Sequence, residues 1–154
     1  MDTKKMKDTK KSSRLRRQRG YSFEIGIVEK FKKFNWNSRR LGSPSTNLPD
    51  VMSVNNNTII ALEAKSTSTS TTYVPADQIE RCVKWVNLFG LYKKTVLLAF
   101  KFKGNENRKL RYYYKVFPYS SVQAQKVRCS YNGKTFLIGE SENVEIFLED
   151  FSFE

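Results

Sequence analysis

Two carboxylates and a lysine form the most informative pattern in the chain. Asp50 follows Pro49, and thirteen residues later Glu63, Ala64 and Lys65 stand at the end of an apolar run. Mg²⁺ takes hard oxygen ligands, and a bound cation acidifies its water and neutralises charge on a phosphate. A neighbouring lysine can stabilise the negative charge that develops during the reaction. These residue types are suited to metal-dependent hydrolysis of a phosphodiester.

The spacing of these residues predicts a β-hairpin that brings the two carboxylates together. Residues 50–54 and 58–65 are two apolar strands. Asn55–Asn57 between them is a turn, because asparagine tolerates a left-handed backbone. Antiparallel pairing through this turn places Asp50 near Glu63.

The same pattern predicts which side chains join the site. Glu63 and Lys65 are two residues apart on one strand, so both face the same side of the sheet. The carbonyl oxygen of Ala64 would complete a set of oxygen ligands. Residues 21–34 form a helix with phenylalanines at helical spacing, and Glu24 lies at the border of that apolar face. A carboxylate there needs a partner, so Glu24 is the fourth candidate.

The remaining elements predict an α/β fold with a central mixed sheet flanked by helices. Residues 66–72 are all Ser or Thr and predict a loop that is mobile without a ligand. A second helix starts near Pro75, which suits a first helical position. The other predicted elements are strands at 94–102 and 111–117, the latter the final strand of the sheet, a weak strand at 134–138 and an acidic helix near 142–151.

The charge of the chain is strongly positive and unevenly distributed. The formal net charge is +13 over 154 residues. Residues 1–19 carry nine Lys/Arg and two Asp, and we expect them to be a disordered basic arm before a single domain at 20–154. The basic excess continues to residue 139, whereas 140–154 carry six acidic residues and no basic one. This balance predicts a polyanionic partner.

Composition excludes several classes of chemistry. The chain has no histidine, which removes His-based acid–base catalysis, Ser–His and Cys–His triads and His-ligated zinc. Its two cysteines, Cys82 and Cys129, are far apart and form no metal-binding or disulfide pattern. No apolar run approaches the ~20 residues that a membrane span needs. We therefore expect a cytoplasmic, nucleoid-associated protein with no membrane partner and no small-molecule cofactor.

Five ordered stretches resemble the archaeal Holliday junction resolvases of the PD-(D/E)XK nuclease superfamily. They extend over roughly 17–117, and the superfamily signature itself is Pro49-Asp50 with Glu63-Ala64-Lys65. The other stretches are Arg19–Glu24, Arg39–Ser43, Tyr73–Gln78 and Thr95–Lys103. This resemblance implies a restriction-endonuclease-like sheet.

The resemblance also implies roles for individual residues. The catalytic set is Glu24, Ser43, Asp50, Glu63 and Lys65. The metal, Mg²⁺ with Mn²⁺ as a substitute, is held by Glu24, Asp50, Glu63 and the carbonyl of Ala64. The implied DNA contacts are Arg17, Arg19, Arg39, Arg40 and Gln78.

The implied activity is symmetric nicking of four-way (Holliday) junctions by a homodimer in recombination and repair. Two alternatives stay open. One is a related nuclease that acts on other branched or foreign DNA, and the other is a non-catalytic junction-binding protein of the same fold. The aromatic group Trp85, Phe89 and Tyr92 and the apolar Leu91 belong either to the core or to a dimer face.

Overall fold

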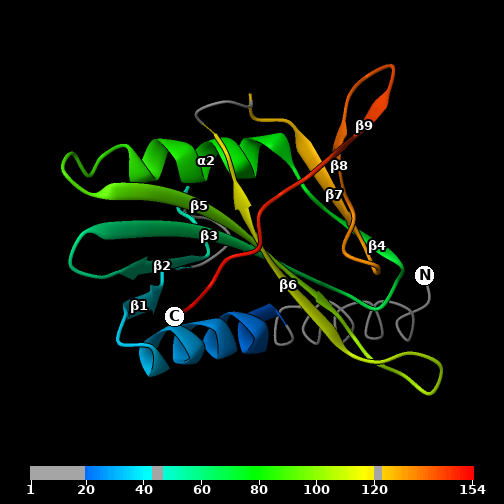
Figure 1. The fold of residues 1–154 in the computed structure, drawn as a ribbon, viewed down its shortest axis with the longest axis horizontal. Coiled ribbons are helices and arrows are strands. Elements are labelled where there is room, and N and C mark those ends of the chain that lie inside the picture. Colours follow the sequence, from blue (N-terminus) through cyan, green and yellow to red (C-terminus); the bar gives the residue numbers. More distant parts are fainter. Residues whose placement is uncertain (1–19, 43–46, 120–122) are drawn as a thin grey trace, which may run out of the picture.

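The computed structural model describes residues 20–42, 47–119 and 123–154 as two β-sheets and two helices (Figure 1). The main sheet has five strands in the order β1-β2-β3-β5-β6. Its strands are β1 (Asn37–Arg40), β2 (Val51–Val54), β3 (Thr58–Thr67), β5 (Lys93–Phe102) and β6 (Arg111–Phe117). The α/β class predicted from the sequence is confirmed.

The second sheet has four strands in the order β4-β7-β8-β9. They are β4 (Thr71–Val74), β7 (Lys126–Ser130), β8 (Thr135–Ile138) and β9 (Asn143–Ile146). This sheet and helix α2 (Ala76–Val86) cover one face of the main sheet, and the N-terminal helix, described over 20–33, covers the other. No helix of the described residues is long and apolar enough to span a membrane.

The hairpin predicted around the candidate site is present. β2 and β3 pair antiparallel, with Val51 opposite Leu62. The side chain of Asn55 closes the turn, since its Oδ1 accepts the Thr58 N–H at 2.9 Å. β3 then pairs in parallel with β5 along its full length. A central strand with neighbours on both sides must be apolar on both faces, which explains the continuous apolar run at Ile59–Leu62.

The N-terminal helix is fixed by a stripe of buried side chains and ended by an asparagine. Phe23, Ile27 and Phe31 recur every four residues and are buried against the sheet. Asn35 has a φ of 66°, and the next N–H, of Trp36, bonds back to the carbonyl of Phe31 at 3.1 Å. This is the geometry of a helix C-terminus closed by a left-handed residue, and it confirms the predicted helix to within one residue at its end.

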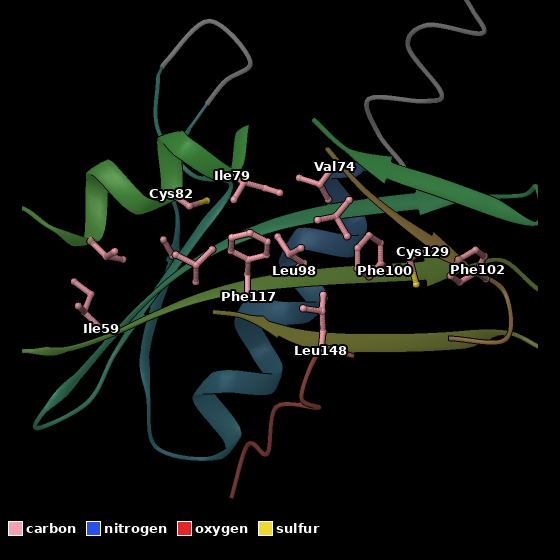
Figure 2. Packing of buried hydrophobic residues seen from close by; sticks show 14 residues of the cluster. Ile59, Val74, Ile79, Cys82, Leu98, Phe100, Phe102, Phe117, Cys129 and Leu148 are labelled. Atoms are coloured by element: carbon pink, nitrogen blue, oxygen red, sulfur yellow. The ribbon is translucent and has the colours of Figure 1, made fainter. Parts of the chain in front are cut away.

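Helix α2 packs against the opposite face of the main sheet. Ile79, Cys82 and Val86 are its buried residues, and Figure 2 shows Ile79 and Cys82 pointing from the helix toward the cluster that contains Leu98 and Phe117. The helix places one more residue, Arg81, beside the strand that carries the predicted catalytic carboxylate.

The prediction of a mobile loop at 66–72 is wrong. β3 continues to Thr67, and β4 begins at Thr71 and pairs with β7. Only the three residues between them form a turn, in which the Thr67 hydroxyl accepts the Thr69 N–H at 3.0 Å. β-branched threonines favour strands, and their hydroxyls can satisfy local backbone groups. Low complexity of the sequence therefore did not mean absence of structure.

The predicted acidic helix at 142–151 is also wrong, and β6 is not the final strand. Residues 143–146 form β9, which pairs with β8 so that Val144 lies opposite Leu137. Of the acidic residues in this segment, Glu145 lies on this edge strand, where charge discourages pairing with another chain. The weak strand predicted at 134–138 is confirmed as β8, whereas β4, β7 and β9 were missed.

The C-terminal segment ties the two faces of the fold together. The backbone carbonyl of Glu149 accepts the Val116 N–H at 2.8 Å, and the backbone N–H of Phe151 donates to the carbonyl of Tyr114 at 2.9 Å. The segment therefore extends the main sheet beyond β6. Phe153 then packs on Phe31 of the N-terminal helix, with ring centroids 4.8 Å apart. The helix that carries Glu24 is thus held in part by the last residues of the chain.

We expect Phe153→Ala to lower the free energy of unfolding by about 2–3 kcal/mol, because it removes a buried ring from this cluster. The matched control is Phe147→Ala. The Phe147 side chain is 88% exposed, so its loss should cost less than about 0.5 kcal/mol. Urea titration followed by circular dichroism measures both. Equal losses in the two variants would contradict the anchoring role of the C-terminal segment.

Candidate active site

The candidate site lies at the point on β3 where its pairing with β2 ends. β2 begins at Val51, opposite Leu62, so β3 has no strand beside it on that side from Glu63 onward. Asp50 takes the place of the missing strand. Its backbone N–H donates to the carbonyl of Leu62 at 3.1 Å, and its Oδ2 accepts the Ala64 N–H at 2.9 Å.

This edge also exposes a carbonyl oxygen. In a strand, the N–H and C=O of one residue point to the same side. Since the N–H of Ala64 points to Asp50, its carbonyl faces the same open edge. Sequence alone predicted the meeting of Asp50, Glu63 and the Ala64 carbonyl, and the hairpin register places them together.

Glu63 turns toward α2 and is fully buried. Its Oε1 accepts two bonds from Arg81, at 2.7 Å from Nη2 and 3.2 Å from Nε. The thiol of Cys82 lies 3.7 Å from the same oxygen. Oε2 is buried too, and no N–H or O–H group of the described residues donates to it while Glu63 is ionised. A buried oxygen without a donor is costly unless a ligand or a proton occupies it.

Burial and Asp50 together change the acidity of Glu63. Burial is the largest cause, and the charge of Asp50 and the hydrogen bond that a protonated Glu63 makes to the Asp50 carboxylate add to it, raising the pKa of Glu63 to about 8. Arg81 opposes this shift without cancelling it. Two adjacent carboxylates that share one proton are a general sign of a site built for a cation or for acid–base chemistry.

Glu24 approaches the same site from the N-terminal helix. Its Oε2 accepts the Arg40 Nε–H at 2.7 Å, and the Arg40 guanidinium stacks on Tyr21 at 4.1 Å. Burial raises the pKa of Glu24; the bond from Arg40 lowers it, and the charge of Asp50 raises it further. Lys65 also acts on Glu24 through its charge. The predicted quartet of Glu24, Asp50, Glu63 and Lys65 therefore belongs to one electrostatic neighbourhood.

The donor set fits a hard divalent cation at Asp50 and Glu63. The unpartnered Oε2 of Glu63, the carboxylate of Asp50 and the carbonyl of Ala64 are oxygens of the kind that Mg²⁺ prefers. The described residues contain no cluster of three or more Asp, Glu or Cys groups placed to hold a metal, and Glu24 is paired with Arg40. The ion pair with Arg40 would have to open before Glu24 could join Asp50 and Glu63 as a ligand.

The remaining predicted residues divide into three groups. Arg40 is held by Glu24 and Tyr21, whereas Arg39 is exposed on β1. The side-chain oxygen of Gln78 is buried and unpartnered in the described part of the chain. Arg17, Arg19, Ser43 and the predicted arm at 1–19 lie outside the described residues.

Arg81 is the site residue that sequence reasoning missed. It lies on the predicted second helix, three residues after Gln78 and next to the buried Cys82. The available signal was the need of a buried Glu63 for a partner, but the sequence does not show which helix residue lies above it. Packing of α2 on β3 decides the pairing.

A second feature is a basic tip formed by three turns beyond the site. The guanidinium groups of Arg108 and Arg111 lie over the ring of Tyr131 at 4.7 and 4.2 Å. The Tyr131 hydroxyl donates to the carbonyl of Lys109, and Arg108 donates to the carbonyl of Thr69. These contacts join the β5–β6, β7–β8 and β3–β4 turns into one positively charged surface, which we call the basic tip.

The sequence profile of the archaeal Holliday junction resolvases (Hjc) matches residues 15–129. The chain belongs to this family. The matched range contains all of the predicted site residues, whereas β8, β9 and the C-terminal segment lie beyond it. The family is one of nucleases that act on branched DNA, as the resemblance implied.

A solved resolvase shares the fold. It is Hjc from Archaeoglobus fulgidus, a Holliday junction resolvase from an archaeal hyperthermophile, with 21% sequence identity and a TM-score of 0.51. The match covers 74% of this chain and 85% of that one. The restriction-endonuclease-like architecture of the chain is thereby confirmed. No curated protein matches the chain significantly.

The raised pKa of Glu63 predicts a pH dependence of stability. The folded state holds this proton more tightly than the unfolded state, whose value is near 4.5, so the stabilisation is complete below pH 4.5 and is lost as pH rises to about 8. Glu63→Gln mimics the protonated acid and should not show this loss. Between pH 5 and 8 in EDTA, the wild type should lose about 3 kcal/mol relative to the variant. Parallel stability curves in urea unfolding experiments would contradict the assignment.

Proposed function

We propose that this resolvase is a Mg²⁺-dependent endonuclease that nicks four-way DNA junctions symmetrically as a homodimer, with Mn²⁺ able to substitute. The observation that carries the proposal is the open edge of β3, where Asp50 and Glu63 meet beside the Ala64 backbone. Without a cation, two adjacent carboxylates would only repel a phosphate.

The protein's own groups have separate tasks in this reaction. Asp50 and Glu63, with the carbonyl of Ala64, would hold the metal, which would acidify water and neutralise charge on the phosphate. Lys65 lies two residues after Glu63 on the same side of β3, where its ammonium group orients the attacking water and stabilises the developing charge. Glu24, once released from Arg40 or through a water, would add a further oxygen to this set.

The basic tip supports binding of a DNA arm. β3 leads directly from Lys65 to the turn that Arg108 holds, so the tip continues the line of the site along the sheet. Stacked guanidinium groups keep their charge at a fixed position, and fixed charge suits contact with phosphates. Such contacts read the backbone and the shape of the junction rather than its sequence.

The exposed apolar residues that follow α2 support the dimer. The side chains of Leu88 and Leu91 are 77% and 103% exposed, and Trp85 with Leu88 lines a groove of about 450 Å³. Exposed apolar residues beside a groove mark a protein–protein contact surface. Trp85 and Phe89 are partly buried against the core, so the aromatic group identified in the sequence divides between core and surface. The two-fold symmetry of a dimer would match that of a junction.

We expect Asp50→Asn to reduce junction cleavage by at least about 100-fold while junction binding is kept or tightened, because the change removes a metal ligand and a negative charge beside the phosphate. The control is Asp150→Asn, the same change at an exposed carboxylate bonded to Lys115. End-labelled four-way junction, linear duplex and flap are each incubated with Mg²⁺, Ca²⁺ or EDTA.

The substrates in this assay separate the proposed function from its alternatives. Symmetric nicks confined to the junction support it. Cutting of the flap or duplex instead indicates a related nuclease for other branched DNA. Binding without cutting under any metal indicates a non-catalytic junction-binding protein, and equal loss of binding and cleavage in Asp50→Asn contradicts the role of Asp50.

The basic tip predicts a change in the salt dependence of binding. The double variant Lys109→Gln/Arg111→Gln should bind with a shallower salt dependence. The magnitude of the slope of log affinity against log salt should fall by about 1.8, since each phosphate contact contributes about 0.9. Arg108 is left intact because it binds the turns together. The charge-matched control is Lys33→Gln, at the end of the N-terminal helix, with Lys93→Gln, at the start of β5 and so at the end of the main sheet opposite the tip. Equal slopes for the two double variants, measured by fluorescence anisotropy with labelled junction, would contradict the role of the tip.

A further inference from the structure

We propose that Arg81 is the built-in counter-ion of the metal site. In this role, its guanidinium occupies Glu63 while no divalent ion is bound and leaves Glu63 when one binds. The proposal rests on the metal-dependent function proposed above, and it makes Arg81 a positioning residue rather than a ligand.

The first observation is the shape of the ion pair. Arginine usually binds a carboxylate as a fork, with one N–H to each oxygen. Here both N–H groups, from Nε and Nη2, converge on Oε1 of Glu63, and Oε2 is left without a partner among the described residues. Arg81 thus neutralises Glu63 and leaves one oxygen toward Asp50.

The second observation is the burial of the acid. The Glu63 side chain is 0% exposed, whereas that of Arg81 is 20% exposed. A buried carboxylate without a cation is strongly destabilising. The neighbouring Arg40 is engaged by Glu24, and Lys84 is exposed and paired with Glu80. Arg81 is therefore the cation that compensates Glu63 in the described structure.

The third observation is a groove beside Arg81 that offers its guanidinium a second binding position. Arg81 lines the groove of about 450 Å³ together with Asp77, Glu80 and Trp85. Asp77 lies four residues before Arg81 and Trp85 four residues after it, so both are on the same side of α2. A released guanidinium can pair with Asp77 and stack on Trp85, two contacts that an arginine favours. The groove offers a second stable position for this side chain.

Two positions for one cation imply competition. A divalent ion at the free Oε2 would lie next to the guanidinium at Oε1, and like charges repel. If each drives the other from Glu63, each weakens the binding of the other by the same factor. Removal of the arginine charge should then tighten metal binding. An arginine that merely orients Glu63 predicts the reverse, since its loss would disorder a ligand and weaken metal binding.

The experiment compares Arg81→Gln with Lys84→Gln, which removes the same charge from the same helix at an exposed position. Calorimetric titration with Ca²⁺, which needs no cleavage, measures the affinity of each full-length protein. Arg81→Gln should bind Ca²⁺ about tenfold more tightly than the wild type, and Lys84→Gln within about twofold of it.

A second readout uses the uncut junction. In EDTA, Arg81→Gln removes a positive charge beside Asp50 and Glu63, so its junction affinity should fall several-fold, and Ca²⁺ should restore it to the wild-type value. Lys84→Gln should lose the same small factor in both conditions. Equal losses of junction affinity with and without Ca²⁺ in Arg81→Gln would contradict the counter-ion role.

The outcomes separate this inference from the proposed function. Failure of the wild type to bind Ca²⁺, Mg²⁺ or Mn²⁺ would overturn both. Metal binding by the wild type with unchanged or weaker Ca²⁺ affinity in Arg81→Gln would overturn the counter-ion role alone. If Arg81→Gln does not fold, Asp77→Asn provides the test with Glu80→Gln as control. Asp77→Asn removes the second position of the guanidinium and should weaken Ca²⁺ binding severalfold, and equal affinities for these two variants would contradict the proposal.

Discussion

The burial of Glu63 beside Asp50 is the constraint on which the rest of the site depends. A carboxylate with no exposed surface needs a positive charge or a proton, and a second carboxylate next to it makes that need stronger. The fold supplies Arg81 from α2 on one side. It supplies Asp50 with a backbone donor, the Ala64 N–H, on the other. What remains is one buried oxygen, Oε2, without a donor among the described residues. The ion pair of Arg81 with Glu63 thus satisfies one carboxylate oxygen and leaves the other without a donor.

That edge exists because two strands have different lengths. β3 extends to Thr67, whereas β2 begins opposite Leu62, so five residues of β3 pair with β5 alone. An unpaired stretch of backbone in the middle of a sheet is normally avoided or covered. Here Asp50 covers part of it by bonding to Ala64, and the nearby Glu24–Arg40 pair lies beside it. The different lengths of β2 and β3 and their register therefore create the open edge, and the charged residues lie along it.

Sequence reasoning was reliable where local patterns decide the structure. The Asn55–Asn57 turn fixed the register of the hairpin, and that register brought Asp50 to Glu63 and Ala64. It was unreliable where tertiary pairing decides. Thr71–Val74 at the end of the threonine run and Asn143–Ile146 in the acidic segment are strands because β7 and β8 lie beside them, and no local pattern reveals those neighbours. Arg81 was missed for a similar reason. Its partner is eighteen residues away in sequence, on another element, and only the packing of α2 brings them together.

The missed residue changes how the catalytic pattern should be understood. A motif of two acids and a lysine describes a metal site with its ion in place, yet the folded chain must also be stable before the ion binds. In this structure Asp50 is bonded to the Ala64 N–H, and each of the two glutamates has an arginine partner, Arg40 for Glu24 and Arg81 for Glu63. Each pair lowers the cost of burying a negative charge, and each must loosen for its acid to act as a ligand. The requirement for stability without metal thus predicts cationic partners near any buried carboxylate pair, and such partners can be sought on the helix that packs over the strand.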